Sequence, residues 1–404
     1  MWYVFGVVND DDIGRRYPHI LFSRHWNLSP PSNYLLGRCD AIVDSICRIP
    51  LQPNYRETLL SVSLVKGAQA TTAIEGNTLT EAEIEQIAGG ESLPQSKEYQ
   101  EREVKNILDA MNQILDEVAY DGRSALVTAD LIKRFHRLVG AELGERFDAI
   151  PGHYRTDARI VGPYRCPQPE HIEELVRRMC DWLQREFGYG KQPQSFADAV
   201  VQAMVTHVYL EWIHPFGDGN GRTGRLLEFY VLLRAGNPDI VSHILSNHYN
   251  QTRTEYYRQL DNASKTRDLT EFLDYAIAGY HDGLREVLTT ISWSQFQVSW
   301  LYLVHTKFAN TPYRKKTVFK RRRGLALAMP QPNKALLPDE IMVQTPELAR
   351  QYAHLTPRTL LRDLEELRKM NLIVGTDDGR YRINGDLLVP HFVKRRIAPA
   401  GAVD

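Results

Sequence analysis

The chain has 404 residues, of which 43% are hydrophobic and 25% are charged, and its formal net charge is −1. This is the composition of an ordinary globular protein with material for two or three domains. The near-zero charge gives no overall attraction to nucleic acid or to anionic membranes, and no apolar run reaches the length of a membrane span. The four cysteines lack Cys-x-x-Cys spacing. We therefore expect a cytoplasmic protein with no membrane partner.

Residues 1–95 are expected to form a helical N-terminal region. Apolar residues at helical spacing predict a helix from Asn54 that runs into Thr71-Thr72-Ala73-Ile74-Glu75-Gly76-Asn77. Gly76 suits the position just after a helix C-terminus, which places Glu75 in the last turn. A negative side chain there opposes the helix dipole, so the position favours a cationic partner.

Residues 96–290 are expected to form a helical core that carries one hairpin. The sequence Ile160-Val161-Gly162-Pro163-Tyr164-Arg165 predicts two short strands that turn at the Gly-Pro pair. Ser195 starts a capping pattern followed by apolar residues at helical spacing up to Ile213. A second helix is predicted from Arg222 to a glycine cap at Gly236. A further helix is expected between Thr270 and Leu288.

The loop between the first two of these helices concentrates residues with chemical roles. It reads His214-Pro215-Phe216-Gly217-Asp218-Gly219-Asn220-Gly221-Arg222-Thr223-Gly224-Arg225. Its glycines and the following helix N-terminus expose backbone N–H groups, which predicts a phosphate site. Arg222 and Arg225 share one face above that site. Asp218 is a hard oxygen ligand for Mg²⁺, and His214 has the pKa of a base for a hydroxyl proton. Together these groups predict nucleotidyl transfer.

Residues 291–336 are expected to connect the core to a C-terminal domain, residues 337–404. The basic run from Arg314 to Arg323 predicts a solvated linker or a contact to nucleic-acid phosphates. In the C-terminal domain, Thr345-Pro346 and Thr356-Pro357 are typical helix starts, and a hairpin follows.

This C-terminal pattern resembles a winged helix-turn-helix. In that arrangement Arg358 and Arg362 would face the major groove of DNA, and Arg380 would lie on the wing. Acidic residues on the same helix oppose phosphate binding; they are Asp363, Glu365 and Glu366. Because the same fold often docks proteins or forms dimers, a DNA partner and a protein partner both remain open.

The central loop resembles the Fic family motif, His-x-Phe-x-Asp/Glu-Gly-Asn-Gly-Arg-x-x-Arg, at every fixed position. The resemblance implies a mainly α fold with a β-hairpin flap, and transfer of AMP from ATP to a protein hydroxyl with Mg²⁺. It implies that His214 is the general base, Asp218 the metal ligand and Phe216 the buried anchor of the loop. The residues implied to bind ATP are Gly219, Asn220, Gly221, Arg222, Thr223, Gly224 and Arg225.

A second segment is similar to the family's inhibitory motif, Ser/Thr-x-x-x-Glu-Gly/Asn. Here it consists of Thr71 and Glu75-Gly76. In the family this glutamate pairs with the second motif arginine, here Arg225, and blocks productive ATP binding. The resemblance therefore implies an enzyme inhibited by its own N-terminal region.

Two other elements follow from the resemblance. Ile160, Val161 and Gly162 fall where Fic proteins have the flap, whose exposed edge docks the target segment by strand addition. The family lines part of its adenine pocket after the motif helix, where Asn250 and Tyr257 are the nearest candidates. An ordinary core or surface aromatic is an equally good interpretation of Tyr257.

The sequence thus predicts an autoinhibited protein adenylyltransferase that modifies a Ser, Thr or Tyr hydroxyl of a target protein or of itself. Gly221 favours AMP transfer, because family members that bind the nucleotide in reverse depart from the motif there. Two alternatives remain open: AMP removal at the same site with Glu75 positioning water, and a DNA-binding regulator whose core senses nucleotide. A homodimer is also open, since family members often pair.

Overall fold

The computed structural model describes residues 10–122, 125–188, 194–312, 315–329 and 334–388. Within these ranges the fold is mainly helical, as predicted, and its strands form two two-stranded sheets. The chain divides into two compact units, residues 1–289 and 290–404, and the division falls inside α12 (Thr270–Ala309). None of the described helices is long and apolar enough to cross a membrane.

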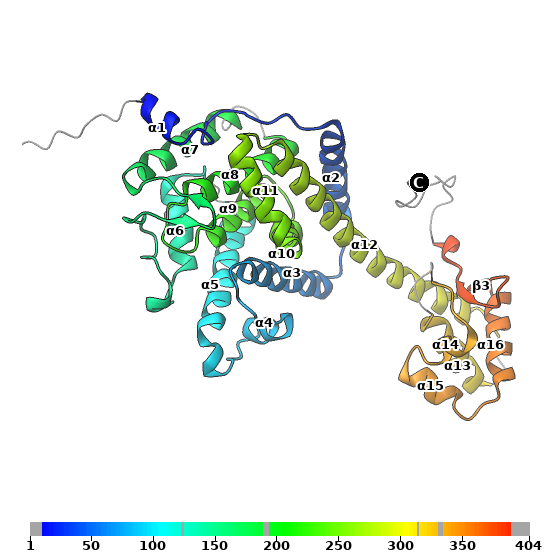
Figure 1. The fold of residues 1–404 in the computed structure, drawn as a ribbon. Coiled ribbons are helices and arrows are strands. Elements are labelled where there is room, and N and C mark those ends of the chain that lie inside the picture. The colour runs from blue at the N-terminus through cyan, green and yellow to red at the C-terminus, as the bar shows by residue number, and fades with distance from the viewer. Residues whose placement is uncertain (1–9, 123–124, 189–193, 313–314, 330–333, 389–404) are drawn as a thin grey trace, which may run out of the picture. The chain divides into compact units, whose positions relative to one another are not determined.

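The first unit is built around two helices, α8 (Phe196–Ile213) and α9 (Asn220–Arg234), which pack against each other. Figure 1 shows the other helices of this unit around them. These are α1 (Asp10–Arg16), α2 (Pro30–Arg48), α3 (Pro53–Ile74), α4 (Glu81–Ala88), α5 (Glu98–Leu115), α6 (Ala129–Val139), α7 (Ile172–Glu186), α10 (Ile244–Gln251) and α11 (Arg253–Thr266). Short helical turns cover Gln95–Lys97, Asp116–Tyr120, Gly144–Arg146, Pro169–His171 and Asp239–Val241.

The predicted bounds of the first motif helix are confirmed, whereas the second helix begins at Asn220, two residues before the predicted Arg222. Ser195 caps α8 by accepting a hydrogen bond from the Asp198 amide at 3.1 Å. Because α8 and α9 are buried on nearly all sides, apolar residues surround both helices rather than forming one stripe. Gly236 has φ +89° just beyond α9, a conformation that glycine adopts without the steric cost of a Cβ.

The helix predicted from Asn54 is α3, and it ends as expected. Glu75 is its C-cap residue, and Gly76 follows with φ +99°. The amide of Gly76 donates to the Ala73 carbonyl at 3.0 Å, which satisfies one of the terminal carbonyls. This ending aims the Glu75 side chain away from the helix axis and towards α9, where its partner lies.

The second unit contains the end of α12 and a compact group of shorter elements. These are α13 (Lys316–Leu327), α14 (Pro338–Met342), α15 (Pro346–Tyr352), α16 (Pro357–Lys369), a turn at Gly385–Leu387, and the antiparallel strands β3 (Ile373–Gly375) and β4 (Tyr381–Ile383). Its core includes Trp300, Val304, Phe308, Leu325, Leu348, Leu360, Leu364 and Ile373. Residues from the stretch expected to be a connecting region, 291–336, therefore help to build the core of this unit.

Candidate active site

His214 lies at the turn between α8 and α9. It is the C-cap of α8 and has φ 47° and ψ 60°, a left-handed conformation that is uncommon for any residue except glycine. Its side chain is 14% exposed, and Nδ1 lies 3.9 Å from Oε2 of Glu211. Burial, followed by the positive charge of Arg155, lowers the pKa of His214 to about 4. The imidazole is therefore neutral at pH 7 and able to accept a proton.

Phe216 and Asn220 hold this turn in shape. Phe216 is fully buried and stacks on His136, with ring centroids 3.7 Å apart. The Asn220 side chain accepts from the Phe216 amide at 3.0 Å and donates to the Phe216 carbonyl at 2.9 Å. His136 accepts from the Gly152 amide at Nδ1, so its Nε2–H donates to the Asp218 carbonyl at 2.9 Å. The role of Phe216 as an anchor thus has a geometric basis.

The N-terminus of α9 offers backbone donors beside His214. Gly219 has φ +78°, and the first helical bond runs from the Thr223 amide to its carbonyl at 3.0 Å. The amides of Asn220, Gly221 and Arg222 precede that bond, so they have no carbonyl partner within the helix. With the helix dipole they form a site suited to an anion.

Two residues predicted to bind ATP lie within the helix packing instead. Thr223 is fully buried. Gly224 faces α8 so closely that an added Cβ would lie 2.6 Å from Nδ1 of His207. A side chain at position 224 would force α8 and α9 apart, so Gly224 permits the close approach of these helices.

Arg225 is held by the end of α3. It is 2% exposed, its Nε donates to Oγ1 of Thr71 at 2.7 Å, and its Nη2 donates to the Thr71 carbonyl at 2.9 Å. Nη2 also pairs with Oε1 of Glu75 at 2.5 Å. Burial alone would raise the pKa of Glu75, but Arg225 and then Arg222 outweigh it, so the pKa is lowered and the carboxylate is ionised. An added Cβ on Gly221 would lie 2.3 Å from the same Oε1, so a side chain at position 221 would push the Glu75 carboxylate aside.

Arg222 is also engaged by carboxylates. It is 3% exposed, its Nη1 donates to Glu103 of α5, and its Nη2 donates to Oδ1 of Asp218 at 2.7 Å. Burial raises the pKa of Glu103, and the charge of Arg222 opposes that rise. Both motif arginines therefore face the loop but are neutralised by acidic side chains.

The surroundings of Asp218 fit a magnesium ion that arrives with a nucleotide. Its carboxylate is 32% exposed and accepts hydrogen bonds from Arg222 and from the Gly219 amide. Across the described ranges, no group of three or more His, Cys, Asp or Glu side chains is placed to hold a metal ion. Mg²⁺ commonly takes only one or two protein carboxylates and completes its shell with phosphate oxygens and water, which matches this single donor beside an anion site.

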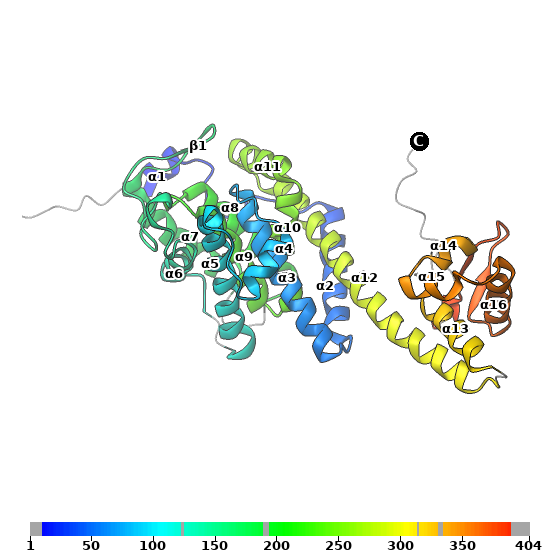
Figure 2. The same cartoon turned by 90° about the horizontal axis from the view of Figure 1, so that it is seen from below.

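The predicted hairpin is present next to the turn. Strand β1 (Ile160–Val161) pairs with β2 (Tyr164–Arg165) in antiparallel register, and Gly162 has φ +55° at the turn. Ile160 is 66% exposed and Val161 45% exposed. Figure 2 shows the hairpin at the edge of the first unit. A strand with an open edge and exposed apolar side chains is suited to docking an extended peptide.

Of the two adenine-pocket candidates, the structure brings one to the site. Tyr257 of α11 donates to the Ile74 carbonyl at 3.4 Å, so its ring lies beside the helix end that carries Glu75. Its pKa is raised by burial and then by the charge of Glu75. Asn250 is half-buried on α10 and makes no side-chain hydrogen bond within the described part of the chain.

Three residues close to the turn were not foreseen from the sequence. Glu103 is 119 positions before its partner Arg222, a separation that no local pattern reveals. Glu211 is one helical turn before His214, so helical spacing alone could have indicated it. Arg155 is buried, and its Nε donates to the His214 carbonyl at 2.7 Å; its place just before the hairpin was the available signal.

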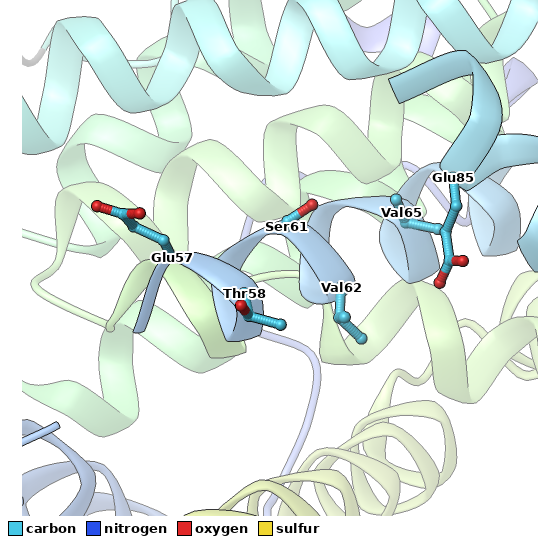
Figure 3. A pocket seen from close by; sticks show the side chains of 6 residues that line it. All are labelled: Glu57, Thr58, Ser61, Val62, Val65 and Glu85. Atoms are coloured by element: carbon cyan, nitrogen blue, oxygen red, sulfur yellow. The ribbon is translucent and has the colours of Figure 1, made fainter. Parts of the chain in front are cut away.

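A shallow surface pocket lies elsewhere, on the outer side of α3. It is lined by Glu57, Thr58, Ser61, Val62, Val65 and Glu85. Figure 3 shows Glu57 and Glu85 at its two ends, with the other side chains between them along α3. It contains no motif residue, no cationic side chain and no buried donor.

Comparisons with known proteins agree with this site. Residues 126–232 match the Fic/DOC family. Protein adenylyltransferase fic-1 of Caenorhabditis briggsae is 31% identical over 205 residues, which are 51% of this chain and 37% of that protein. Protein adenylyltransferase Fic of Nematostella vectensis is 29% identical over 231 residues, 57% of this chain and 50% of that protein. The chain thus spans half or less of the length of these curated relatives.

Solved structures show the same fold. A Fic family protein from Desulfovibrio desulfuricans G20 aligns with a TM-score of 0.54 at 20% identity, over 89% of this chain and 98% of that one. Fic-1 of C. elegans aligns with a TM-score of 0.52 at 24% identity, over 65% of this chain and 73% of that one. The structure is therefore that of a Fic-fold protein. Within it, residues 126–232 match a Fic domain.

Proposed function

We propose that this protein is a protein adenylyltransferase, which moves AMP from ATP to a Ser, Thr or Tyr hydroxyl of a target protein in the cytoplasm. One observation carries the proposal: a buried, neutral His214 lies at the N-terminus of α9 beside two arginines. A proton acceptor, an anion site and cationic side chains at one turn are what in-line attack of a hydroxyl on the α-phosphorus of ATP requires. The names of the matched relatives support it.

The reaction follows from the positions of these groups. His214 accepts the proton of the target hydroxyl, and the hydroxyl oxygen attacks the α-phosphorus of ATP. A bond forms from that oxygen to phosphorus, and the bond to the leaving pyrophosphate breaks. The α9 amides and Arg222 and Arg225 stabilise the charge that develops on the leaving group. Magnesium held by Asp218 would supply further positive charge on the phosphates.

We propose that Glu75 inhibits this reaction. The Glu75 carboxylate already accepts a hydrogen bond from Nη2 of Arg225 at 2.5 Å. An ATP phosphate must displace this carboxylate to bind the same donor. A charge-assisted pair in a buried site is stronger than the same pair in water. Displacement therefore costs free energy, and the resting protein holds ATP poorly or in an unproductive position.

The test uses ATP labelled at the α-phosphate, with the intact protein and a cell lysate as the source of targets. Glu75→Gly should label protein strongly, wild type weakly, and the Glu75→Gly/His214→Ala double variant not at all. Arg48→Ala in the Glu75→Gly background serves as a surface control, because Arg48 is exposed on α2 and pairs with Asp44 one helical turn away. No labelling in Glu75→Gly would refute the transferase. Release of AMP from labelled protein by wild type would instead indicate AMP removal.

For the second unit we propose a winged helix-turn-helix that contacts duplex DNA. The observation that favours it concerns the acidic residues of α16. Asp363 is fully buried and bonded to Arg321 and Arg322 of α13 at 2.7 and 2.8 Å, so it does not repel phosphate at the surface. Arg358 and Arg362 are exposed on the same helix.

Strand β4 is preceded by Arg380, which pairs with Glu340 and Asp378 at 3.2 and 3.1 Å. We therefore assign the phosphate contacts to α16 rather than to the hairpin. Binding of the whole protein to a labelled duplex, followed by anisotropy, should weaken with salt and in Arg358→Ala/Arg362→Ala. It should be unaffected in His214→Ala. Equal binding by the double arginine variant would refute this second role.

A further inference from the structure

A segment without regular secondary structure joins α1 to α2 and crosses the first unit (residues 17–29; blue in Figure 1). It is fixed at both ends. At the first end, the hydroxyl of Tyr17 accepts from the Gln168 amide at 2.9 Å and bonds Nδ1 of His171 at 2.8 Å. At the other, the His25 carbonyl accepts from the Leu269 amide at 3.1 Å. Ordering an irregular segment costs conformational entropy, so contacts along residues 17–29 must offset that cost.

In the middle of this segment, His19 reaches the flap. Its Nε2 lies 2.8 Å from the hydroxyl of Tyr164 in β2, and that hydroxyl donates to the Trp212 carbonyl at 2.6 Å. A phenol has a single proton, so Tyr164 must accept from His19, which fixes the Nε2–H tautomer of His19. Burial lowers the pKa of His19 to about 4, which keeps the ring neutral. The ring also makes edge contacts with Tyr164 and Trp212.

Trp212 is two residues before His214, so this chain of hydrogen bonds ties the flap to the backbone that carries the base. Arg155 makes a second tie. Its Nε donates to the His214 carbonyl at 2.7 Å, and its Nη1 and Nη2 donate to the carbonyls of Asp157 and Pro167 at 2.5 and 2.6 Å. One buried guanidinium therefore joins the two stems of the hairpin to the catalytic turn.

We propose that His19, Tyr164 and Arg155 are positioning residues that hold the flap at a fixed distance and register from His214. The proposal rests on the proposed transfer function, because the flap matters only if it docks a target hydroxyl. It makes the segment between α1 and α2 part of the target-docking apparatus, although it lies more than a hundred residues before the flap in sequence.

The need for such ties follows from the size of the flap. Each strand has two residues, and a lone two-stranded hairpin of that length has little stability in water. A docked target strand takes its position from the flap edge. A displacement of about 1 Å in a reacting group lowers a rate by about a hundredfold, so an unanchored flap would align the target hydroxyl poorly.

The first test measures hydrogen exchange in the intact protein and does not depend on activity. The reporter is the Cys166 amide, which donates to the Arg159 carbonyl at 3.1 Å across the hairpin stem. Losing the bond from His19 should speed its exchange by about fivefold in His19→Ala, and losing both bonds of the hydroxyl should speed it at least as much in Tyr164→Phe. His19→Gln retains a donor and should restore most of the protection.

Two control variants separate this effect from general loosening. Tyr280→Phe also removes one buried phenolic hydrogen bond, to Asn237 at 2.7 Å, but far from the flap. Arg24→Ala alters the same N-terminal segment at the surface, where Arg24 pairs with Glu186 and lies over the Trp26 ring. Neither should change the exchange of Cys166. Unchanged Cys166 exchange in both Tyr164→Phe and His19→Ala would overturn the proposal.

The second test compares binding with transfer in the Glu75→Gly background. Tyr164→Phe and His19→Ala should lower label transfer to lysate proteins by about tenfold, while ATP affinity measured by calorimetry stays within twofold, because neither residue contacts the α9 anion site. An equal loss of ATP affinity would show a general structural role and overturn the proposal. If Glu75→Gly itself transfers no label, the transferase proposal fails, and the anchor is judged by the exchange result alone.

Discussion

Two carboxylates, one in each unit, have opposite surroundings. Asp363 of α16 is fully buried and accepts hydrogen bonds from Arg321, Arg322 and Tyr352. Glu211, beside His214, has one carboxylate oxygen that is buried with no hydrogen-bond partner in the described structure. The second unit gives its carboxylate three hydrogen-bond donors, whereas the Fic site leaves one carboxylate oxygen without any.

This difference separates a cluster of ion pairs with a structural role, which we call the Asp363 lock, from a site that exchanges ligands. Around the His214 turn, Arg222 is shared by Glu103 and Asp218, and Arg225 is held by Glu75. An anionic phosphate entering such a site must displace a carboxylate or bring a cation with it. Asp363 itself is fully buried, so its ion pairs join α13 to α16 from the interior of the second unit.

The largest predicted effect comes from breaking the lock. Asp363→Ala leaves Arg321, Arg322 and the Tyr352 hydroxyl without their shared acceptor, which we expect to destabilise the second unit by about 3 kcal/mol. The estimate is at the lower end for a buried pair because both arginines are partly exposed, at 14% and 23%. Hydrogen exchange of the α16 and β3 amides in the intact protein measures it.

Glu365→Ala is the matched control on the same helix, because it removes only a surface pair with Arg368. Its α16 amides should exchange as in wild type. Equal protection of α16 in Asp363→Ala and in Glu365→Ala would show that the buried cluster is not a lock, and the contrast between the two units would fail.

The next effect concerns the carboxylate without a partner. Burial and then the charge of Glu75 raise the pKa of Glu211 to about 7, from 4.5 when unfolded. The folded state therefore holds a proton that the unfolded state has released, and stability falls as pH rises from about 4.5 to 7. Glu211→Gln removes this dependence, so it should stabilise the first unit at pH 8 by about 3 kcal/mol more than at pH 4.5.

Urea denaturation of wild type and Glu211→Gln at the two pH values measures the difference. Glu57→Gln, an exposed position on α3, is the control and should show no pH-dependent change. If Glu211→Gln raises the free energy of unfolding equally at both pH values, ionisation of Glu211 does not destabilise the folded state. The surroundings of Glu211 would then differ from those of Asp363 in how the side chains pack and not in how charge is compensated.

The sequence was sufficient where function depends on neighbours along the chain. The loop from His214 to Arg225 reveals its anion site because the helix N-terminus and its glycines are local features. The end of α3 at Glu75 and Gly76, and the hairpin at Gly162, were predicted for the same reason, since turn residues carry their own conformational preferences.

Contacts between distant segments could not be predicted in this way. No pattern pairs Glu103 with Arg222, or His19 with Tyr164, because such pairs are set by how α5 or the N-terminal segment packs on α8 and α9. The adenine-pocket candidates show the same limit: Tyr257 reaches the end of α3, whereas Asn250, equally plausible by position, makes no side-chain hydrogen bond within the described residues. The pairing of Glu75 with Arg225 was predicted only through the family resemblance.

The smallest effect tests whether Glu75 is held by its arginine alone. Thr71→Val keeps the shape of Thr71 but removes the hydroxyl that accepts from Nε of Arg225. A buried guanidinium N–H without an acceptor costs about 1 kcal/mol, so Arg225 should hold Glu75 less firmly, and labelling from α-labelled ATP should rise about fivefold over wild type. Thr72→Val is the neighbouring control, since it loses only bonds within α3, to the Ala68 and Gln69 carbonyls. If both variants raise labelling equally, the end of α3 inhibits through its packing as a whole. The pair of Glu75 with Arg225 would then be a structural ion pair, like those of Asp363, and not one that a ligand displaces.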